Sequence, residues 1–189
     1  MGDITPQAFV EKWARSGLSE RSASHQHFID LCRMLGQPTP AEANPGGDFY
    51  TFGKGVSKTG AGGGKGFADV WYRGHFAFEY TGMHKDLGAA YDQLLLYRKD
   101  LENPPLLVVS DMDRFEVHTN FTGTVKRVHA FADAELPREE NLRVLRALFT
   151  DPDGWVFRVS VRLYPQAGDP VHRPRTEGRG LPYVRTEHR

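Results

Sequence analysis

The sequence predicts an α/β fold in which a mixed central sheet is flanked by helices. Two helical patterns open the chain, three strand-like segments follow, and a long helix precedes three further strands and a final helix. Apolar residues recur every three to four positions before residue 37 and change to a strand-like pattern after residue 48. This order is typical of helices that pack on a mixed sheet.

The first two predicted helices occupy about residues 5–17 and 19–35. Thr5 is a suitable N-cap because proline follows it, and Gly36 ends the second helix. Apolar residues form one stripe on each helix, namely Phe9, Val10 and Trp13 on the first and Phe28, Leu31, Cys32 and Leu35 on the second. Residues 37–48, rich in proline, glycine and alanine, are expected to form a loop.

Three strand segments follow, at residues 49–52, 67–72 and 75–80. Arg73-Gly74 separates the last two and indicates a tight hairpin. The glycine-rich residues 60–66 are expected to form a flexible turn.

A long helix is predicted at about residues 85–102, with a buried stripe formed by Leu87, Ala90, Tyr91, Leu94, Tyr97 and Leu101. Residues 106–109 form a continuous apolar run, which is typical of a central strand covered on both faces. The helix between residues 75–80 and 106–109 predicts that these strands are parallel neighbours.

The last elements are strands near residues 115–120 and 125–131 and a helix at 139–149. In the first of these strands, Phe115, Val117 and Thr119 alternate with Glu116, His118 and Asn120, which indicates a strand nearer an edge. We therefore divide the chain into N-terminal helices (1–36), a core (37–152) and a weakly structured basic tail (153–189).

Composition excludes several classes of protein. Lys plus Arg and Asp plus Glu both number 24, so the zero net charge excludes a strongly basic protein that coats nucleic acid. No apolar run approaches the ~20 residues of a membrane span. Cys32 is the single cysteine, which excludes an intramolecular disulfide. Because the N-terminus lacks a secretory signal pattern, we expect a cytoplasmic protein without a membrane partner.

Asp69 and Glu79 form the most informative pair of polar residues. Each lies within an apolar strand, and the hairpin between them predicts that the two strands pair. Two neighbouring carboxylates in a sheet repel each other and lose hydration, and a divalent cation removes both penalties. Magnesium favours such a site, with carbonyl oxygens and water as further ligands. The alternative is that both side chains point to solvent.

This arrangement resembles the PD-(D/E)xK nuclease core, in which a strand with Asp, a hairpin, a strand with Glu-x-Lys and a helix follow in order. Gln93 and Tyr97, four residues apart, resemble the Q-x-x-x-Y helix of several nuclease families. Tyr97 also fits a role in packing.

Longer segments resemble the N-terminal endonuclease domain of MmeI-like (type IIL) restriction–modification enzymes. The similarity covers about residues 5–152. It rests on segments in the same order: 20–32 (ERSASHQHFIDLC), 66–71 (GFADVW), 78–80 (FEY), 82–87 (GMHKDL), 102–106 (ENPPL) and 111–114 (DMDR). In that family a helical spacer, an adenine methyltransferase domain and a target-recognition domain follow.

The resemblance implies an endonuclease that uses Mg²⁺, or Mn²⁺ in its place, to hydrolyse double-stranded DNA in restriction–modification or phage defence. Asp69, Glu79 and the main-chain carbonyl of Tyr80 would hold the metal, and Gln93 would act in the same site. A methyltransferase or target-recognition domain or subunit would be the partner. Glu20 and Gln26 are candidates for an additional ligand.

One position departs from the family pattern, because Thr81 stands where the lysine of Glu-x-Lys is expected. Lys85 could replace this lysine, or it could be a solvated residue at the start of a helix. An alternative function is therefore a catalytically inactive nuclease fold that contacts DNA or assembles with a methyltransferase. The basic tail also suggests a truncated or frameshifted product.

Overall fold

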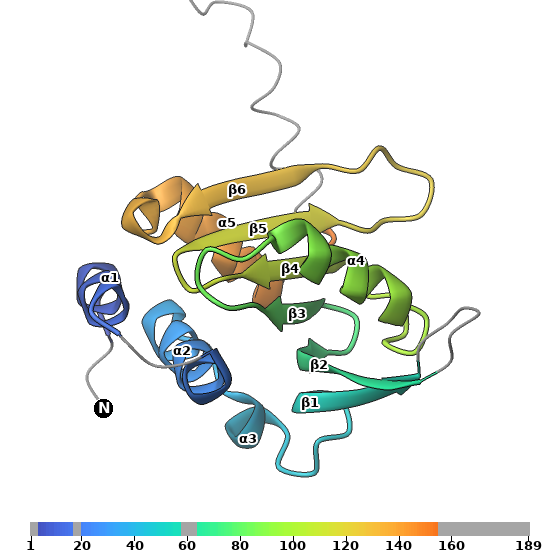
Figure 1. Cartoon of the computed structure of the whole chain (residues 1–189). Helices are drawn as coiled ribbons and strands as arrows, with labels where there is room; N and C mark the ends of the chain where they lie inside the picture. The colour runs from blue at the N-terminus through green and yellow to red at the C-terminus, as the bar shows by residue number, and fades with distance from the viewer. Residues whose placement is uncertain (1–3, 17–19, 58–63, 155–189) are drawn as a thin grey trace, which may run out of the picture.

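The computed structural model describes residues 4–16, 20–57 and 64–154. The six strands form one mixed sheet in the order in which they occur in the chain (Figure 1). Their bounds are β1 (Tyr50–Ser57), β2 (Lys65–Tyr72), β3 (Phe76–Tyr80), β4 (Leu106–Ser110), β5 (Arg114–Thr119) and β6 (Val128–Ala132). Neighbouring strands are antiparallel except β3 and β4, which are parallel as predicted.

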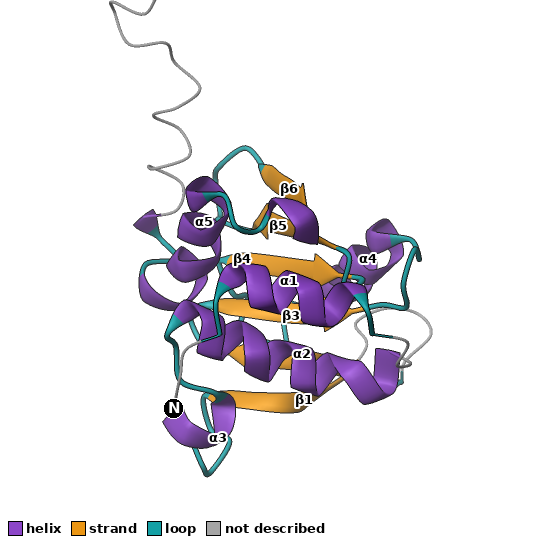
Figure 2. Ribbon diagram, turned by 90° about the vertical axis from the view of Figure 1, so that its left-hand side faces the viewer, coloured by secondary structure: helices purple, strands orange, loops and turns teal. Residues whose placement is uncertain are grey.

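Helices cover both faces of this sheet (Figure 2). On one face lie α1 (Pro6–Ala14), α2 (Glu20–Leu35) and α5 (Glu139–Thr150), and the short α3 (Pro40–Ala43) contacts β1. The opposite face packs against α4 (Leu87–Tyr97), which contacts β2, β3 and β4. The predicted α/β class with a mixed sheet is thus confirmed. None of the described helices has the length and apolar character of a membrane span.

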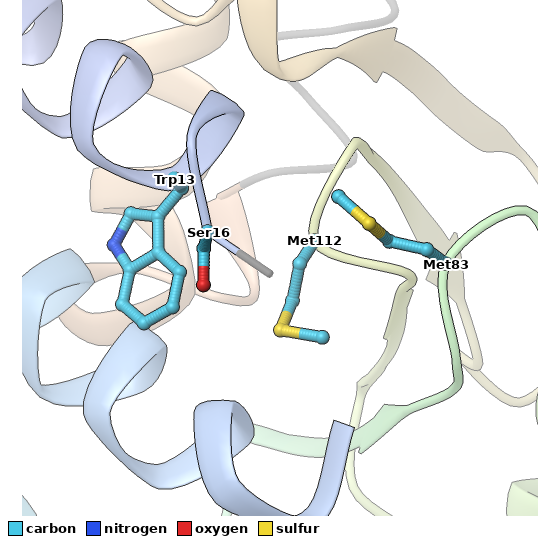
Figure 3. A pocket seen from close by; sticks show the side chains of 4 residues that line it. All are labelled: Trp13, Ser16, Met83 and Met112. Atoms are coloured by element: carbon cyan, nitrogen blue, oxygen red, sulfur yellow. The ribbon is translucent and has the colours of Figure 1, made fainter. Parts of the chain in front are cut away.

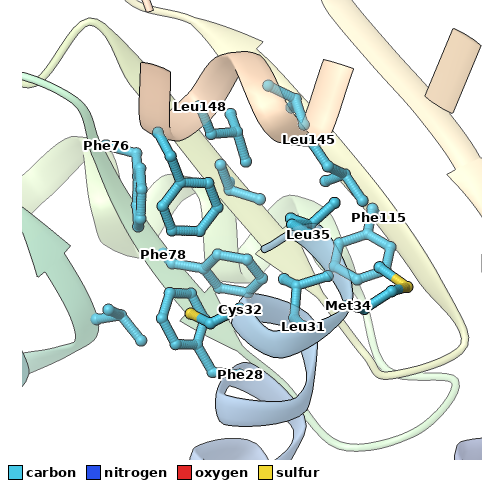
Figure 4. Close-up of a cluster of buried hydrophobic side chains, with 14 of the residues drawn as sticks. Phe28, Leu31, Cys32, Met34, Leu35, Phe76, Phe78, Phe115, Leu145 and Leu148 are labelled. Atoms are coloured by element: carbon cyan, nitrogen blue, oxygen red, sulfur yellow. The ribbon is translucent and has the colours of Figure 1, made fainter. Parts of the chain in front are cut away.

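The larger core fills the space between the sheet and the first helical layer (Figure 4). Phe28 of α2 lies at its centre, with its ring 5.6 Å from that of Phe78 and 6.3 Å from that of Phe149. Each fully buried side chain of this size contributes about 1.5–3 kcal/mol. This core fixes α2 against β3, the strand that carries Glu79.

The smaller core lies between the sheet and α4. Trp71 is fully buried there, and its Nε1 donates to the carbonyl of Leu101 at 2.8 Å. The ammonium of Lys54 lies 4.1 Å from the centre of its ring. Leu87, Leu94 and Tyr97, which were predicted to be buried, line the α4 side of this core.

Local capping signals determine several element ends. The side chain of Thr5 accepts from the amide of Ala8 at 3.2 Å, as expected for the predicted N-cap. Asp86 caps α4 by accepting from the amide of Gly88 at 2.8 Å. Gly36 has a φ of +67° directly after α2, and Gly74 has a φ of +70° in the β2–β3 turn.

Several predicted boundaries were wrong. β1 runs on to Ser57, beyond the predicted end at residue 52, and β6 begins at Val128 and not at residue 125. The segment 37–48 is not only loop, because Pro40 starts the helix α3 and Glu42 reaches back to the amide of Thr39 at 2.9 Å.

The long helix ends at Tyr97 and not near residue 102. Residues 98–102 form turns, and Glu102 and Asn103 then adopt positive φ values of 62° and 51°. Lys65 and Gly66, which were predicted to belong to a turn, are the first residues of β2. Residues 60–63 of the predicted turn and 155–189 of the predicted tail lie outside the described residues.

β5 lies nearer an edge of the sheet, as its alternating pattern predicted, but the polar His118 in that pattern is buried. β5 is paired between β4 and the edge strand β6. The imidazole of His118 is buried, stacks on Tyr91 with 4.1 Å between ring centres, and lies 3.1 Å from Glu116. Burial lowers the pKa of His118, and the nearby ammonium of Lys126 adds to this effect.

Candidate functional site

The candidate site lies where β2 and β3 diverge. The last pair of residues in their ladder is Val70 and Phe78, so Asp69 and Glu79 occupy the next facing positions. In place of a further ladder bond, the carboxylate of Asp69 accepts from the amide of Tyr80 at 2.7 Å. The structure therefore brings Asp69 beside the main chain that carries Glu79.

The direction of this amide follows from the strand geometry. The amide of Thr81 donates to the carbonyl of Ser110 in β4 at 2.9 Å. Amides of successive residues in a strand point to opposite neighbours, so the amide of Tyr80 faces β2. The carbonyl of Tyr80 is directed to the same side as its amide, which is the side of Asp69.

In β2 the regular alternation of side chains between the two faces of the sheet is interrupted at Asp69. Ala68 and Trp71 both pack in the core beneath α4, whereas Val70 packs in the core beneath α2. Across the ladder, Gly53 of β1 has a φ of +60°, which accommodates this irregularity. The irregularity leaves the Asp69 carboxylate free to turn toward β3.

Glu79 faces α4 and is 7% exposed. The side-chain amide of Gln93 donates to its Oε1 at 2.5 Å, and the negative charge of Glu79 adds to the burial that raises the pKa of Tyr97. The predicted shared face of Gln93 and Tyr97 is thus directed at Glu79. A charge-assisted hydrogen bond of this kind contributes about 1.5–3 kcal/mol.

The carboxyl group of Asp69 has a raised pKa. Burial is the main cause, and it is opposed by the amide of Tyr80 and by the imidazole of His25. Because burial disfavours its ionised form, Asp69 would gain from a cation placed beside it.

The donor set around these two residues is small. Within the described ranges no group of three or more His, Cys, Asp or Glu side chains gathers as metal ligands. Two carboxylates and the carbonyl of Tyr80 fit Mg²⁺, which keeps several of its waters, better than they fit Zn²⁺.

The other predicted residues lie at different distances from this centre. Thr81 directly follows β3 and is half-buried, whereas Lys85 is exposed in the segment between β3 and α4. The side-chain nitrogen of Gln26 donates to Asp30 at 2.9 Å, and its role as an additional ligand stays a prediction. The side chain of Glu20 lies outside the described part of the chain.

Asp111 was not among the predicted site residues, although its carboxylate holds the loop after β3 in place. Its carboxylate accepts from the amides of Asp113 and Arg114, at 3.1 and 2.9 Å, and from the amide of His84 at 3.2 Å. The signal was the position of an aspartate directly after a buried strand, where it bonds the amides two and three residues ahead.

Gly66 allows Tyr97 to approach the sheet. A Cβ atom at Gly66 would overlap the Tyr97 hydroxyl and lie 2.5 Å from Cζ. We expect Gly66→Ala to lower the free energy of unfolding by about 1–3 kcal/mol, because the ring must move. Urea denaturation measures this loss. Gly55→Ala is the control, since its Cβ would meet the Phe67 ring at an ordinary 3.7 Å. Equal losses would contradict the explanation.

Asp133 lies in the short 3₁₀ turn Asp133–Glu135 and is buried. Neither carboxylate oxygen has a hydrogen-bond partner among the described residues, and the nearest His27 nitrogen lies 3.8 Å away. Burial raises the pKa of Asp133, although His27 partly opposes this effect.

This burial predicts a pH dependence of stability. The native state binds the Asp133 proton more tightly than the unfolded chain, so stability falls as the pH rises from about 3.9 through the raised pKa. We expect Asp133→Asn to be more stable than the native protein at pH 7 by about 1–3 kcal/mol, with the difference vanishing at low pH. Denaturation across pH measures it. A variant less stable than the native protein at pH 7 would show that the carboxylate is stabilising.

A separate pocket lies between the end of α1 and the loops after β3 and β4 (Figure 3). It is lined by Trp13, Ser16, Met83 and Met112 and has room for about one water molecule. None of the predicted metal ligands lines it, so we do not assign it to the candidate site.

Comparison of the chain with protein-family models, with curated proteins and with solved structures finds no match. The chemistry of the site must therefore be inferred from its own residues.

Proposed function

We propose that the chain is a Mg²⁺-dependent DNA endonuclease domain that hydrolyses phosphodiester bonds in double-stranded DNA. The observation that carries this proposal is the approach of Asp69 to the main chain beside Glu79, at the diverging end of the β2–β3 hairpin. Two partly desolvated carboxylates at such a place are costly unless a cation is bound.

Asp69, Glu79 and the carbonyl of Tyr80 would hold the metal. When bound, Mg²⁺ would lower the pKa of a water ligand and neutralise charge on the scissile phosphate. Gln93 supports this role by fixing one oxygen of Glu79, which leaves the orientation of that carboxylate defined before a metal binds. Lys85 is exposed on the segment that follows the site and is available to contact a phosphate.

The balanced charge of the chain supports the assignment of DNA cleavage and of sequence recognition to different domains or subunits. Few net phosphate contacts give weak binding to DNA with a shallow salt dependence. We therefore assign sequence recognition to a methyltransferase or target-recognition partner, within a cytoplasmic restriction–modification or phage-defence enzyme.

A plasmid-nicking assay tests the proposal. We expect nicking of supercoiled DNA with Mg²⁺ or Mn²⁺, none with EDTA, and none by Glu79→Gln in either metal. Glu139→Gln, which changes an exposed carboxylate on α5, is the matched control. Equal activity of native protein and Glu79→Gln would assign the nicking to a contaminant and reject the proposed site.

Thr81 favours a second function, a nuclease fold that binds metal or DNA without cutting. A hydroxyl at this position holds a water but carries no positive charge. This function predicts Mg²⁺-dependent stabilisation of the native protein without nicking.

A further inference from the structure

One buried hydrogen bond joins α2 to the end of β3. Nδ1 of His27 lies 2.8 Å from the hydroxyl oxygen of Tyr80. His27 is fully buried and Tyr80 is 3% exposed, so solvent does not compete for this bond.

The imidazole of His27 is held on several sides. The rings of Phe9 and Trp13 from α1 meet it edge-on, with centres 4.9 and 4.8 Å away, and the Phe115 ring of β5 lies at 5.9 Å. The opposite nitrogen, Nε2, lies 3.8 Å from Asp133. The ring therefore offers Tyr80 a fixed partner.

Tyr80 connects this partner to the candidate site. Its hydroxyl bonds His27, while its main-chain amide bonds the carboxylate of Asp69 at 2.7 Å. Glu79 is its immediate neighbour in the chain. Holding the side chain of Tyr80 in place therefore also holds the main chain around it. This main chain carries Glu79 and bonds the carboxylate of Asp69.

We propose that His27 is a positioning residue for the candidate site, acting through Tyr80. The purpose of this positioning, which is to prepare a metal site, rests on the proposed function. The link from His27 through Tyr80 to Asp69 does not, and it can be tested without metal or DNA. Loss of the bond lets the end of β3 open locally, so the Tyr80–Asp69 hydrogen bond breaks more often than the rest of the sheet.

A second tyrosine provides a matched control. Tyr50 of β1 is also buried, and its hydroxyl lies 3.6 Å from Sγ of Cys32. Cys32 belongs to α2, the helix that also carries His27. Tyr50 has no hydrogen bond to either carboxylate of the site within the described chain. Tyr50→Phe and Tyr80→Phe therefore each remove one buried hydroxyl that faces α2, and only the second removes the link to Asp69.

Amide hydrogen exchange measures the link in the metal-free protein. In Tyr80→Phe and His27→Leu we expect the protection of the amide at position 80 to fall about tenfold more than that of Val108, which reports global unfolding. His27→Asn, close in size to leucine but with a polar atom near the position of Nδ1, should restore most of the protection. Tyr50→Phe should lower both amides equally. Equal losses at position 80 and Val108 in Tyr80→Phe would overturn the proposal.

Binding of Mn²⁺, followed by electron paramagnetic resonance, tests the purpose of the link. We expect Tyr80→Phe to bind Mn²⁺ several-fold more weakly than Tyr50→Phe. Native protein that binds no Mn²⁺ would reject the proposed metal site and with it the purpose, while exchange at position 80 would still decide the link. Native-like Mn²⁺ binding by Tyr80→Phe would overturn the positioning role.

Discussion

Asp69→Asn is expected to raise the melting temperature of the metal-free protein and to abolish the further rise that Mg²⁺ produces. Burial raises the pKa of Asp69, so its ionised form is costly in the native state. An asparagine oxygen still accepts from the amide of Tyr80, while the buried charge is lost. A gain of about 1 kcal/mol corresponds to roughly 2–4 °C in a domain of this size.

The difference in stability between Asp69→Asn and the native protein should change with pH in one direction. An acid with a raised native pKa destabilises the native state progressively as the pH rises above its unfolded value near 3.9. The advantage of Asp69→Asn should therefore grow with pH and level off above the native pKa. Calorimetry from pH 4 to 8 in EDTA measures it.

Mg²⁺ should stabilise the native protein more than it stabilises Asp69→Asn, which reverses the order expected without metal. At a Mg²⁺ concentration about 100-fold above its dissociation constant, the native protein gains about 2.7 kcal/mol, whereas Asp69→Asn gains little. Asp92→Asn, an exposed carboxylate on α4, is the control and should respond as the native protein does. A native protein that does not respond to Mg²⁺, together with a destabilised Asp69→Asn, would mean that the carboxylate serves only to hold the amide of Tyr80.

Much of the fold was predictable because its signals are local. Thr5 before Pro6, Gly36 after α2, and Arg73-Gly74 each specify a cap or a turn through their own backbone preferences. The parallel pairing of β3 and β4 follows from the helix between them. By contrast, burial of His118 depends on α4 and β6, which no local pattern around β5 reveals.

The candidate site was predictable in its residues but not in its bonds. The facing positions of Asp69 and Glu79 follow from hairpin register. Helix spacing predicted that Gln93 and Tyr97 share a face, but not that Gln93 bonds Glu79. The bond from the Tyr80 amide to Asp69 replaces a ladder bond and depends on an irregularity in β2. The bond between His27 and Tyr80 joins residues 53 positions apart, and its only sequence signal was a histidine on the buried face of α2.

Thr81→Lys should increase DNA cleavage by about 10²–10⁴-fold if the native site lacks only a positioned cation. Thr81 lies two residues after Glu79, so regular strand geometry places both side chains on one face. The amide of Thr81 donates to the carbonyl of Ser110 at 2.9 Å, and this bond fixes the main chain at position 81. The substitution therefore changes the side chain while the backbone stays in place. An ammonium at this position can orient the attacking water and favour its deprotonation.

Three comparisons separate this effect from simple attraction of DNA. Thr81→Met gives a side chain of similar length without charge and should cleave no faster than the native protein. Thr81→Lys combined with Glu79→Gln should be inactive, because a lysine cannot replace the metal ligand. Lys85→Ala should lower native activity only if Lys85 already supplies the cation. Cleavage by Thr81→Lys no faster than by the native protein, with Lys85→Ala equally unaffected, would show that a missing ammonium does not limit this site.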